Sequence, residues 1–207
     1  MKLIQPNYQI LTKLDGKEIL KSIEIAGRTA YKSEDKITDN SAEKFIAMIV
    51  NRGHLSVIEH QGFSVRFIVD RGISHEIVRH RLASFTQEST RYCNYGKDKF
   101  GNELNIIDLR PHLTKEQSEQ WLNAMELAED SYQTLIQNGC TPQFARSVLP
   151  NSLKTEIVVT ANLREWRIIF QQRTANTAHP QIREVMRPLL DEIKTLIPII
   201  FNDINYE

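Results

Sequence analysis

Apolar residues return every three or four positions along much of the chain, which is the spacing of an amphipathic helix. The pattern predicts helices over residues 17–31, 41–52, 70–82, 114–138, 142–149, 162–173 and 181–201. In the last of these segments Ile182, Met186, Leu189 and Ile193 fall on one face. We therefore expect helices that each bury one side against a common core.

Several predicted helix ends carry capping residues. Three pairs have the spacing of a capping box: Asn40 with Glu43, Thr114 with Gln117, and Asn162 with Glu165. Asp70 is placed to cap the helix that follows it. Gly53 and Gly139 stand where a helix commonly stops.

Runs rich in β-branched residues predict strands over residues 63–69, 105–109 and 153–160. Strands and helices mix without regular βαβ alternation, which favours an α+β fold over a doubly wound sheet. The chain has no internal repeat, low-complexity tract or Pro/Gly-rich linker. We therefore expect one domain over residues 1–207.

Composition narrows the class of protein. The 207 residues are 41% hydrophobic and 25% charged, and 26 basic residues balance 26 acidic ones. This is globular composition, and zero net charge argues against a protein that coats DNA or RNA. Two cysteines cannot build a disulfide framework, and no apolar stretch approaches eighteen residues. We expect a soluble protein of a reducing compartment, the cytoplasm.

The balanced charge hides a segregation. Seven of the twelve lysines lie in residues 1–44 and none lies in residues 45–96, where every cation is an arginine. Arginine alone suggests planar, bidentate contacts to carboxylate or phosphate groups, although the distribution by itself is equally compatible with compositional accident.

The densest polar stretch runs from Glu76 to Tyr92 and contains Arg79-His-Arg81 at a predicted helix end, followed by Ser89 and Thr90. Consecutive helical residues point about 100° apart, so the three basic side chains cannot all touch one small group. They can hold a large ligand, or two ligands that meet there. A solvated basic helix end is the simpler alternative.

Two other chemistries fit the sequence poorly. His75 and His80 are five residues apart, not the four that place two zinc ligands on one helical face, and His54 and His60 are six apart. Cys93 lacks a recognised nucleophile motif. Neither a metal site nor a covalent nucleophile is therefore expected.

A second dense stretch covers residues 162–173 and ends at Arg173. Helix capping is enough to explain an asparagine at position 162. An arginine at a helix end, such as Arg173, can simply donate hydrogen bonds to the last carbonyls of its helix.

Arg79-His-Arg81, seven residues and then Ser89 resemble the signature of the flavin-dependent thymidylate synthases. Four further blocks look like that family and occur in its order: residues 26–31, 53–60, 145–150 and 162–173. The resemblance implies a mixed, largely antiparallel sheet flanked by helices, in a homotetramer whose active sites lie at subunit interfaces. It also implies methylation of dUMP to dTMP, with methylenetetrahydrofolate as carbon donor and NADPH-reduced FAD as hydride source.

The resemblance assigns residues to roles. Those matching flavin contacts are His54, Ser56, Arg79, His80, Arg81, Gln87, Asn162 and Arg164. Those matching the dUMP site are Glu76, Arg79, Gln87, Glu88, Ser89, Thr90, Arg91, Arg146 and Arg173. Arg91 and Arg146 suit the phosphate, and Arg173 matches the arginine that polarises the uracil, with no covalent adduct to the enzyme.

The chain departs from the family pattern at several positions. It has Glu76 where glutamine is usual and Gln87 where glutamate is usual, so we hypothesise that the two are partners around one ligand, with Glu88 as an alternative carboxylate. Ile168 replaces a polar flavin contact. His179 lines the substrate side, or else its neighbour Pro180 serves only to start the last helix.

Two function classes compete with the enzyme. The first is a single-stranded nucleic-acid-binding module that uses Arg79, Arg81 and Arg91, with stacking on Phe85, Tyr92 and Tyr95. The second is a metal-dependent hydrolase, which the histidine spacing disfavours.

Overall fold

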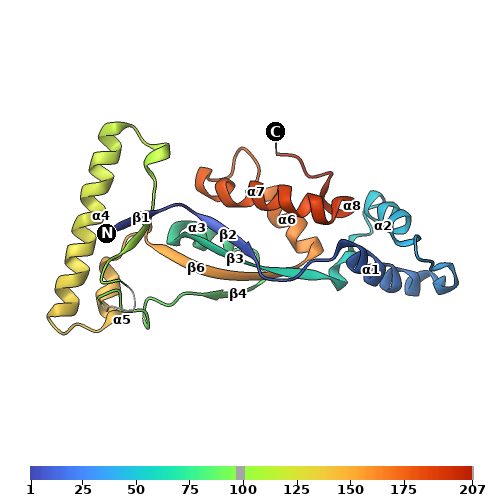
Figure 1. Ribbon diagram of the computed structural model, residues 1–207, viewed down its shortest axis with the longest axis horizontal. Helices are drawn as coiled ribbons and strands as arrows, with labels where there is room; N and C mark the ends of the chain where they lie inside the picture. The colour runs from blue at the N-terminus through green and yellow to red at the C-terminus, as the bar shows by residue number, and fades with distance from the viewer. Residues whose placement is uncertain (97–100, 207) are drawn as a thin grey trace. The chain divides into compact units, whose positions relative to one another are not determined.

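The computed structural model describes residues 1–96 and 101–206. Its strands are β1 (Lys2–Ile4), β2 (Asn7–Ile10), β3 (Gly62–Asp70), β4 (Ser84–Gln87), β5 (Asn105–Ile107) and β6 (Lys154–Asn162). Its α-helices are α1 (Gly16–Tyr31), α2 (Ala42–Asn51), α3 (Arg71–Ile77), α4 (Lys115–Gln137), α5 (Pro142–Ala145), α6 (Leu163–Arg173), α7 (Pro180–Leu196) and α8 (Pro198–Phe201) (Figure 1). Short 3₁₀ helices are η1 (Glu34–Lys36), η2 (Leu55–His60), η4 (Arg110–His112) and η5 (Arg146–Val148).

The strands form two sheets. The larger has the order β2-β3-β6-β4, and the smaller joins β1 to β5. β1 and β5 run parallel, with Leu3 opposite Ile106. The expected α+β class with mixed sheets is confirmed; the largely antiparallel character of the larger sheet stays a prediction.

The chain divides into two compact units that each draw on several segments. Unit 1 comprises Met1–Asn7, Phe67–Arg79 and Thr86–Ile157, and unit 2 comprises Tyr8–Arg66, His80–Phe85 and Val158–Glu207. Four of the boundaries fall within strands β2, β3, β4 and β6, and the fifth follows Arg79, just after α3. The expectation of one domain stays a prediction.

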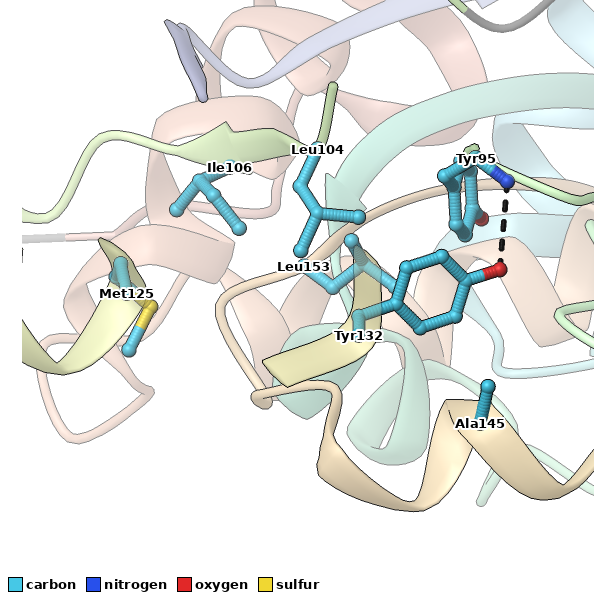
Figure 2. Close-up of a cluster of buried hydrophobic side chains, with 7 residues drawn as sticks. All are labelled: Tyr95, Leu104, Ile106, Met125, Tyr132, Ala145 and Leu153. Atoms are coloured by element: carbon cyan, nitrogen blue, oxygen red, sulfur yellow. Dashed lines mark hydrogen bonds between the residues drawn. The ribbon is translucent and has the colours of Figure 1, made fainter. Parts of the chain in front are cut away.

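The core of unit 1 forms under the long helix α4. Figure 2 shows Met125 and Tyr132 of this helix with Leu104, Ile106 and Leu153, all of them buried. The backbone N–H of Tyr95 donates to the Tyr132 hydroxyl at 3.3 Å. Burying a tyrosine requires a partner for its polar end, and this bond supplies one.

The core of unit 2 is aromatic. Phe63 of β3 stacks on Trp166 of α6 with ring centroids 4.6 Å apart, and the indole N–H donates to the Phe63 carbonyl at 3.0 Å. Phe170 meets Phe201 of α8 edge to face at 5.7 Å. These contacts fix α6, which carries Arg173 at its end, against β3 and α8.

Most predicted helix ends are confirmed. Thr114 and Gln117 form the complete capping box of α4. Asp70 accepts from the Ile73 N–H at 2.7 Å, and Asn162 accepts from the Glu165 N–H at 2.8 Å. Gly53 and Gly139 adopt φ angles of 72° and 84°, which favour glycine at a helix stop.

Several local predictions are wrong. The predicted helix over residues 142–149 is the short α5 followed by the 3₁₀ helix η5, and the predicted helix over residues 181–201 is broken at Ile197 between α7 and α8. The helix from Asp70 ends at Ile77 instead of Leu82, because the chain must leave the helix to enter the sheet at β4, so Arg79, His80 and Arg81 lie in the connecting turns. The capping box of Asn40 does not form, because Ser41 is the N-cap of α2. The Ser41 hydroxyl instead donates to Glu24 at 2.8 Å.

Strands β1, β2 and β4 were not predicted. Each spans only three or four residues, too few for a period to stand out, and sheet partners distant in sequence define them. Within the described part of the chain, no helix combines the length and apolar character needed to cross a bilayer.

Candidate functional site

The expected site residues fall into two groups, one in each unit. Unit 2 contains His54, Ser56, His80, Arg81, Asn162, Arg164 and Arg173. Unit 1 contains Glu76, Arg79, Gln87, Glu88, Ser89, Thr90, Arg91 and Arg146.

His80 and Arg173 meet within unit 2 although 93 residues separate them. The Arg173 Nε–H donates to His80 Nε2 at 3.0 Å. His80 is only 6% exposed, and its Nδ1 lies 3.7 Å from the Glu165 carboxylate, which is 5% exposed. The side chains form a row, Arg173–His80–Glu165, that runs from the end of α6 to its first turn.

The protonation states of this row follow from burial and charge. Burial, together with the nearby Arg173 guanidinium, lowers the pKa of His80 to about 4. The imidazole is therefore neutral near pH 7, and since Nε2 accepts from Arg173, we infer that the ring proton is on Nδ1, facing Glu165. Because the imidazole is neutral, its 3.7 Å contact with Glu165 is not an ion pair at neutral pH; burial raises the pKa of the Glu165 carboxyl.

The other unit 2 residues offer hydrogen-bond donors near the surface. His54 precedes η2, with its Nδ1 3.4 Å from the Tyr31 hydroxyl, and Ser56 is exposed. Arg164, in the first turn of α6, donates to Glu59 at 2.5 Å and remains 46% exposed. Asn162 caps α6, so its structural role is established, and a flavin contact by this residue stays a prediction.

The unit 1 residues of the expected phosphate site lie close together. Arg146, at the start of η5, donates through Nη1 to the Thr90 hydroxyl at 3.4 Å. Ser89 Oγ accepts from the Arg91 N–H at 3.3 Å. Arg91 and Arg146 are exposed, whereas Thr90 is buried. Arg146 thus contacts the segment that carries Ser89, Thr90 and Arg91, and the binding of one anion by these residues together stays a prediction.

Gln87 and Glu88 are held by protein groups. The Gln87 amide donates to Ser74 at 2.8 Å and to Thr155 at 3.1 Å. Glu88 accepts from the Tyr95 hydroxyl at 2.8 Å and from Lys154 Nζ at 2.9 Å. Glu88 therefore anchors the segment after β4, and the pairing of Glu76 with Gln87 around a ligand stays a hypothesis.

The structure disfavours the nucleic-acid alternative at one position. Tyr92 is 80% exposed, but Tyr95 is only 4% exposed and donates its hydroxyl to Glu88. A buried ring cannot stack on a base, so the stacking role proposed for Tyr95 is wrong.

Sequence reasoning missed Glu165, Lys154 and the anchoring role of Tyr95. Glu165 looked like half of a capping box, and nothing in the sequence pairs Lys154 with Glu88, 66 residues away. His179 caps α7, its Nδ1 accepting from the Gln181 N–H at 3.3 Å, and Pro180 starts that helix. Ile168 is half-buried.

Comparisons with known proteins agree with one another. A family model described as "Thymidylate synthase complementing protein" matches residues 11–199. The chain is 32% identical to the flavin-dependent thymidylate synthase of Geobacter sulfurreducens, over 88% of this chain and 80% of that protein. It is 34% identical to the enzyme of the same name from Pyrococcus furiosus, over 81% of this chain and 68% of that one.

The fold also resembles a solved structure. A UMP/dUMP methylase, PolB from Streptomyces cacaoi bound with 5-Br dUMP, superposes with a TM-score of 0.80 at 20% identity, over 98% of this chain and 96% of the other. At that identity the likeness concerns the fold alone.

Proposed function

Because the chain belongs to the flavin-dependent thymidylate synthase family, we propose that it catalyses the reductive methylation of dUMP to dTMP. Methylenetetrahydrofolate is the carbon donor, and FAD reduced by NADPH supplies the hydride. The observation that carries the proposal is the Arg173–His80 hydrogen bond, because it joins the residue expected at the uracil to a residue expected at the flavin.

The unit 2 residues fit a flavin dinucleotide by the chemistry of their donors. Arg81 and Arg164 are exposed cations suited to a pyrophosphate, while His54 and Ser56 are exposed hydrogen-bonding groups suited to polar ring edges. FAD, when bound, supplies the hydride that completes the methyl group. His80, Arg79, Gln87 and Asn162 are the remaining proposed flavin contacts.

The unit 1 residues fit the nucleotide. We assign the phosphate of dUMP to Arg91 and Arg146, with Ser89 and Thr90 completing the hydrogen bonds. Support comes from the 3.4 Å bond that joins Arg146 to Thr90 and from the exposure of both arginines. Glu76, Arg79, Gln87 and Glu88 stay proposed contacts of the same substrate.

Arg173 is the proposed catalytic residue. A guanidinium keeps its charge at any accessible pH, so it stabilises the negative charge that develops on the uracil ring and makes C5 nucleophilic. His80 accepts the Nε–H and so limits the orientations of the guanidinium. No enzyme nucleophile is required in this scheme, and neither Cys93 nor Cys140 is assigned a step.

The proposal is tested by tritium release from C5-labelled dUMP. We expect purified protein to show flavin absorbance and the wild type to release tritium only with NADPH and methylenetetrahydrofolate. Arg173→Ala should lose about 100-fold or more in turnover, the usual cost of removing a group that stabilises developing charge. Full turnover in Arg173→Ala would refute the role given to Arg173.

A further inference from the structure

A cavity of about 370 Å³ opens in unit 2 among the end of α1, η1 and α2. Its volume lies in the range of small-ligand sites. Arg28, Lys36 and Arg52 line it, together with the rings of Tyr31 and Phe45. None of the residues expected at the flavin or dUMP is among those lining it, so the function proposed above assigns the cavity no ligand.

Of the three cationic side chains that line this cavity in the described part of the chain, one is neutralised by a neighbouring carboxylate and two are not. Arg28 is neutralised by Glu24 at 2.8 Å, and its guanidinium stacks on Phe45 at 4.2 Å from the ring centroid. Lys36 and Arg52 are exposed, and within residues 1–96 and 101–206 neither side chain has a hydrogen bond or an ion pair. Glu34 and Asp35 adjoin Lys36 in η1 but do not line the cavity.

The cavity adjoins the expected flavin site. Tyr31 lines it, and the Tyr31 hydroxyl lies 3.4 Å from His54 Nδ1. His54 is one of the proposed flavin contacts. An extended ligand whose reactive ring lies at the flavin can therefore place a charged end among Lys36 and Arg52.

We propose that this cavity binds the anionic end of a cosubstrate, held by Lys36 and Arg52. Two such ends exist in the reaction, the 2′-phosphate of NADPH and the glutamyl carboxylates of the folate, and both offer oxygen acceptors to an ammonium and a bidentate guanidinium. The identification of the ligand as a cosubstrate rests on the proposed function.

The test measures binding to flavin-loaded protein by isothermal titration calorimetry. One pair of probes is adenosine 2′,5′-bisphosphate and adenosine 5′-monophosphate; the other is pteroyltriglutamate and pteroylglutamate. The variant is Lys36→Gln/Arg52→Gln. The matched control is Lys13→Gln/Lys44→Gln, which removes the same charge from exposed lysines of unit 2 that do not line the cavity.

We expect the wild type and the control to bind the more anionic probe of one pair about tenfold more tightly, and the cavity variant to lose that preference. The pair that responds identifies the ligand as phosphate or as glutamyl tail. An unchanged preference in both pairs, or an equal loss in the control, overturns the proposal. Tritium release by the wild type is measured in parallel: probe binding that depends on Lys36 and Arg52 without turnover would refute the proposed function and leave the anion site standing.

Discussion

The side chain of Arg173 is oriented by a buried neighbour, His80. A free arginine side chain has many rotamers, and ordering it costs entropy each time a ligand binds. Here the Nε–H is donated to a histidine that is only 6% exposed and has Glu165 on its other side. The guanidinium is thereby oriented before substrate arrives, which is the arrangement that electrostatic stabilisation of a transition state requires.

Glu165 is accordingly predicted to be a positioning residue that acts through His80. Glu165→Leu removes the acceptor facing Nδ1, so His80 can move its proton to Nε2 and no longer accept from Arg173. We expect kcat for tritium release to fall about tenfold with a smaller change in the KM for dUMP, as for loss of a hydrogen bond to a charged group.

Two further variants complete that test. Glu165→Gln keeps an acceptor and should recover much of the activity, whereas Glu126→Gln, on the exposed side of α4, should have none of these effects. Wild-type kinetics in Glu165→Leu would show that the row does not orient Arg173.

His80 also predicts a pH dependence of stability. Its pKa is about 4 in the folded protein and near 6.5 when unfolded, so between these values the unfolded chain binds more protons. Above pH 6.5 His80 is neutral in both states, and the free energy of unfolding keeps its full value. As the pH falls toward 4, protonation of His80 in the unfolded chain lowers the free energy of unfolding by about 3 kcal/mol at most. Glu165, whose pKa is raised by burial, acts in the opposite sense.

Urea unfolding between pH 7 and pH 4.5 measures this effect. His80→Gln removes the titrating group, so its free energy of unfolding should decline less over the interval than that of the wild type. Parallel pH curves for the two proteins would contradict the assignment.

At the scale of elements, α6 is preceded by its N-cap Asn162, for which two roles are to be separated: capping the helix and the proposed contact with the flavin. Asn162 accepts the Glu165 N–H at 2.8 Å, which places Glu165 in the first turn, and Asn162 is also a proposed flavin contact. Close packing fixes the start of the helix as well, because a Cβ at Gly62 would lie 2.4 Å from the Ala161 carbonyl oxygen. The strand-to-helix junction therefore has little freedom.

Asn162 variants separate the two uses. Asn162→Ala should lower the free energy of unfolding by about 1 kcal/mol, the usual cost of losing an N-cap, while Asn162→Asp retains the acceptor and should stay near wild type. If the amide also donates to the flavin, Asn162→Asp weakens FAD binding, measured by fluorescence titration, without the loss of stability. Equal stability of the alanine and wild-type proteins would exclude the capping role.

The segment after β4 depends on an ion pair with β6. Lys154 contacts Glu88 at 2.9 Å with side-chain exposures of 18% and 14%, and Glu88 immediately precedes the expected phosphate-binding residues. Lys154→Met leaves a largely buried carboxylate without its cation. We expect a loss of about 1–3 kcal/mol in unfolding free energy and a several-fold higher KM for dUMP.

A double-mutant cycle with Glu88→Gln is the control for this pair. If the ion pair is what holds the segment, the double variant should lose less than the sum of the single losses. Strict additivity would show that Lys154 and Glu88 act independently.

At the scale of the whole molecule, zero net charge coexists with local positive charge. The lysines concentrate in residues 1–44, whereas none of the proposed flavin and dUMP contacts is a lysine and six of them are arginines of residues 79–173. Arginines from distant parts of the chain can act at one site if assembling subunits bring different surface patches together at a symmetric interface.

Mixing two inactive variants tests whether the active site is shared between subunits. Arg91→Ala and Arg173→Ala alter residues of different units. If one subunit supplies Arg91 and another Arg173, co-refolded mixtures should regain about a quarter of wild-type tritium release, since random assembly of a symmetric oligomer leaves that share of sites intact. Sites built within one subunit would show no recovery, which would contradict the shared site.

The sequence by itself determined the features that depend on residues close together along the chain. The period of apolar residues predicted α1, α4 and α6 closely, and the caps at Asp70, Thr114 and Asn162 form as expected. These features depend on residues three or four positions apart. The resemblance to a known family identified the candidate site residues by matched motifs, again from short stretches of sequence.

The tertiary structure decided what depends on distant residues. Sheet pairing ended α3 at Ile77, and it defined strands too short to carry a period. Burial made His80 neutral, and only folding brought Arg173 to it across 93 residues. Charges and pairings of this kind follow from the dielectric surroundings and geometry of the folded chain, whereas helix periods and caps follow from neighbours along it.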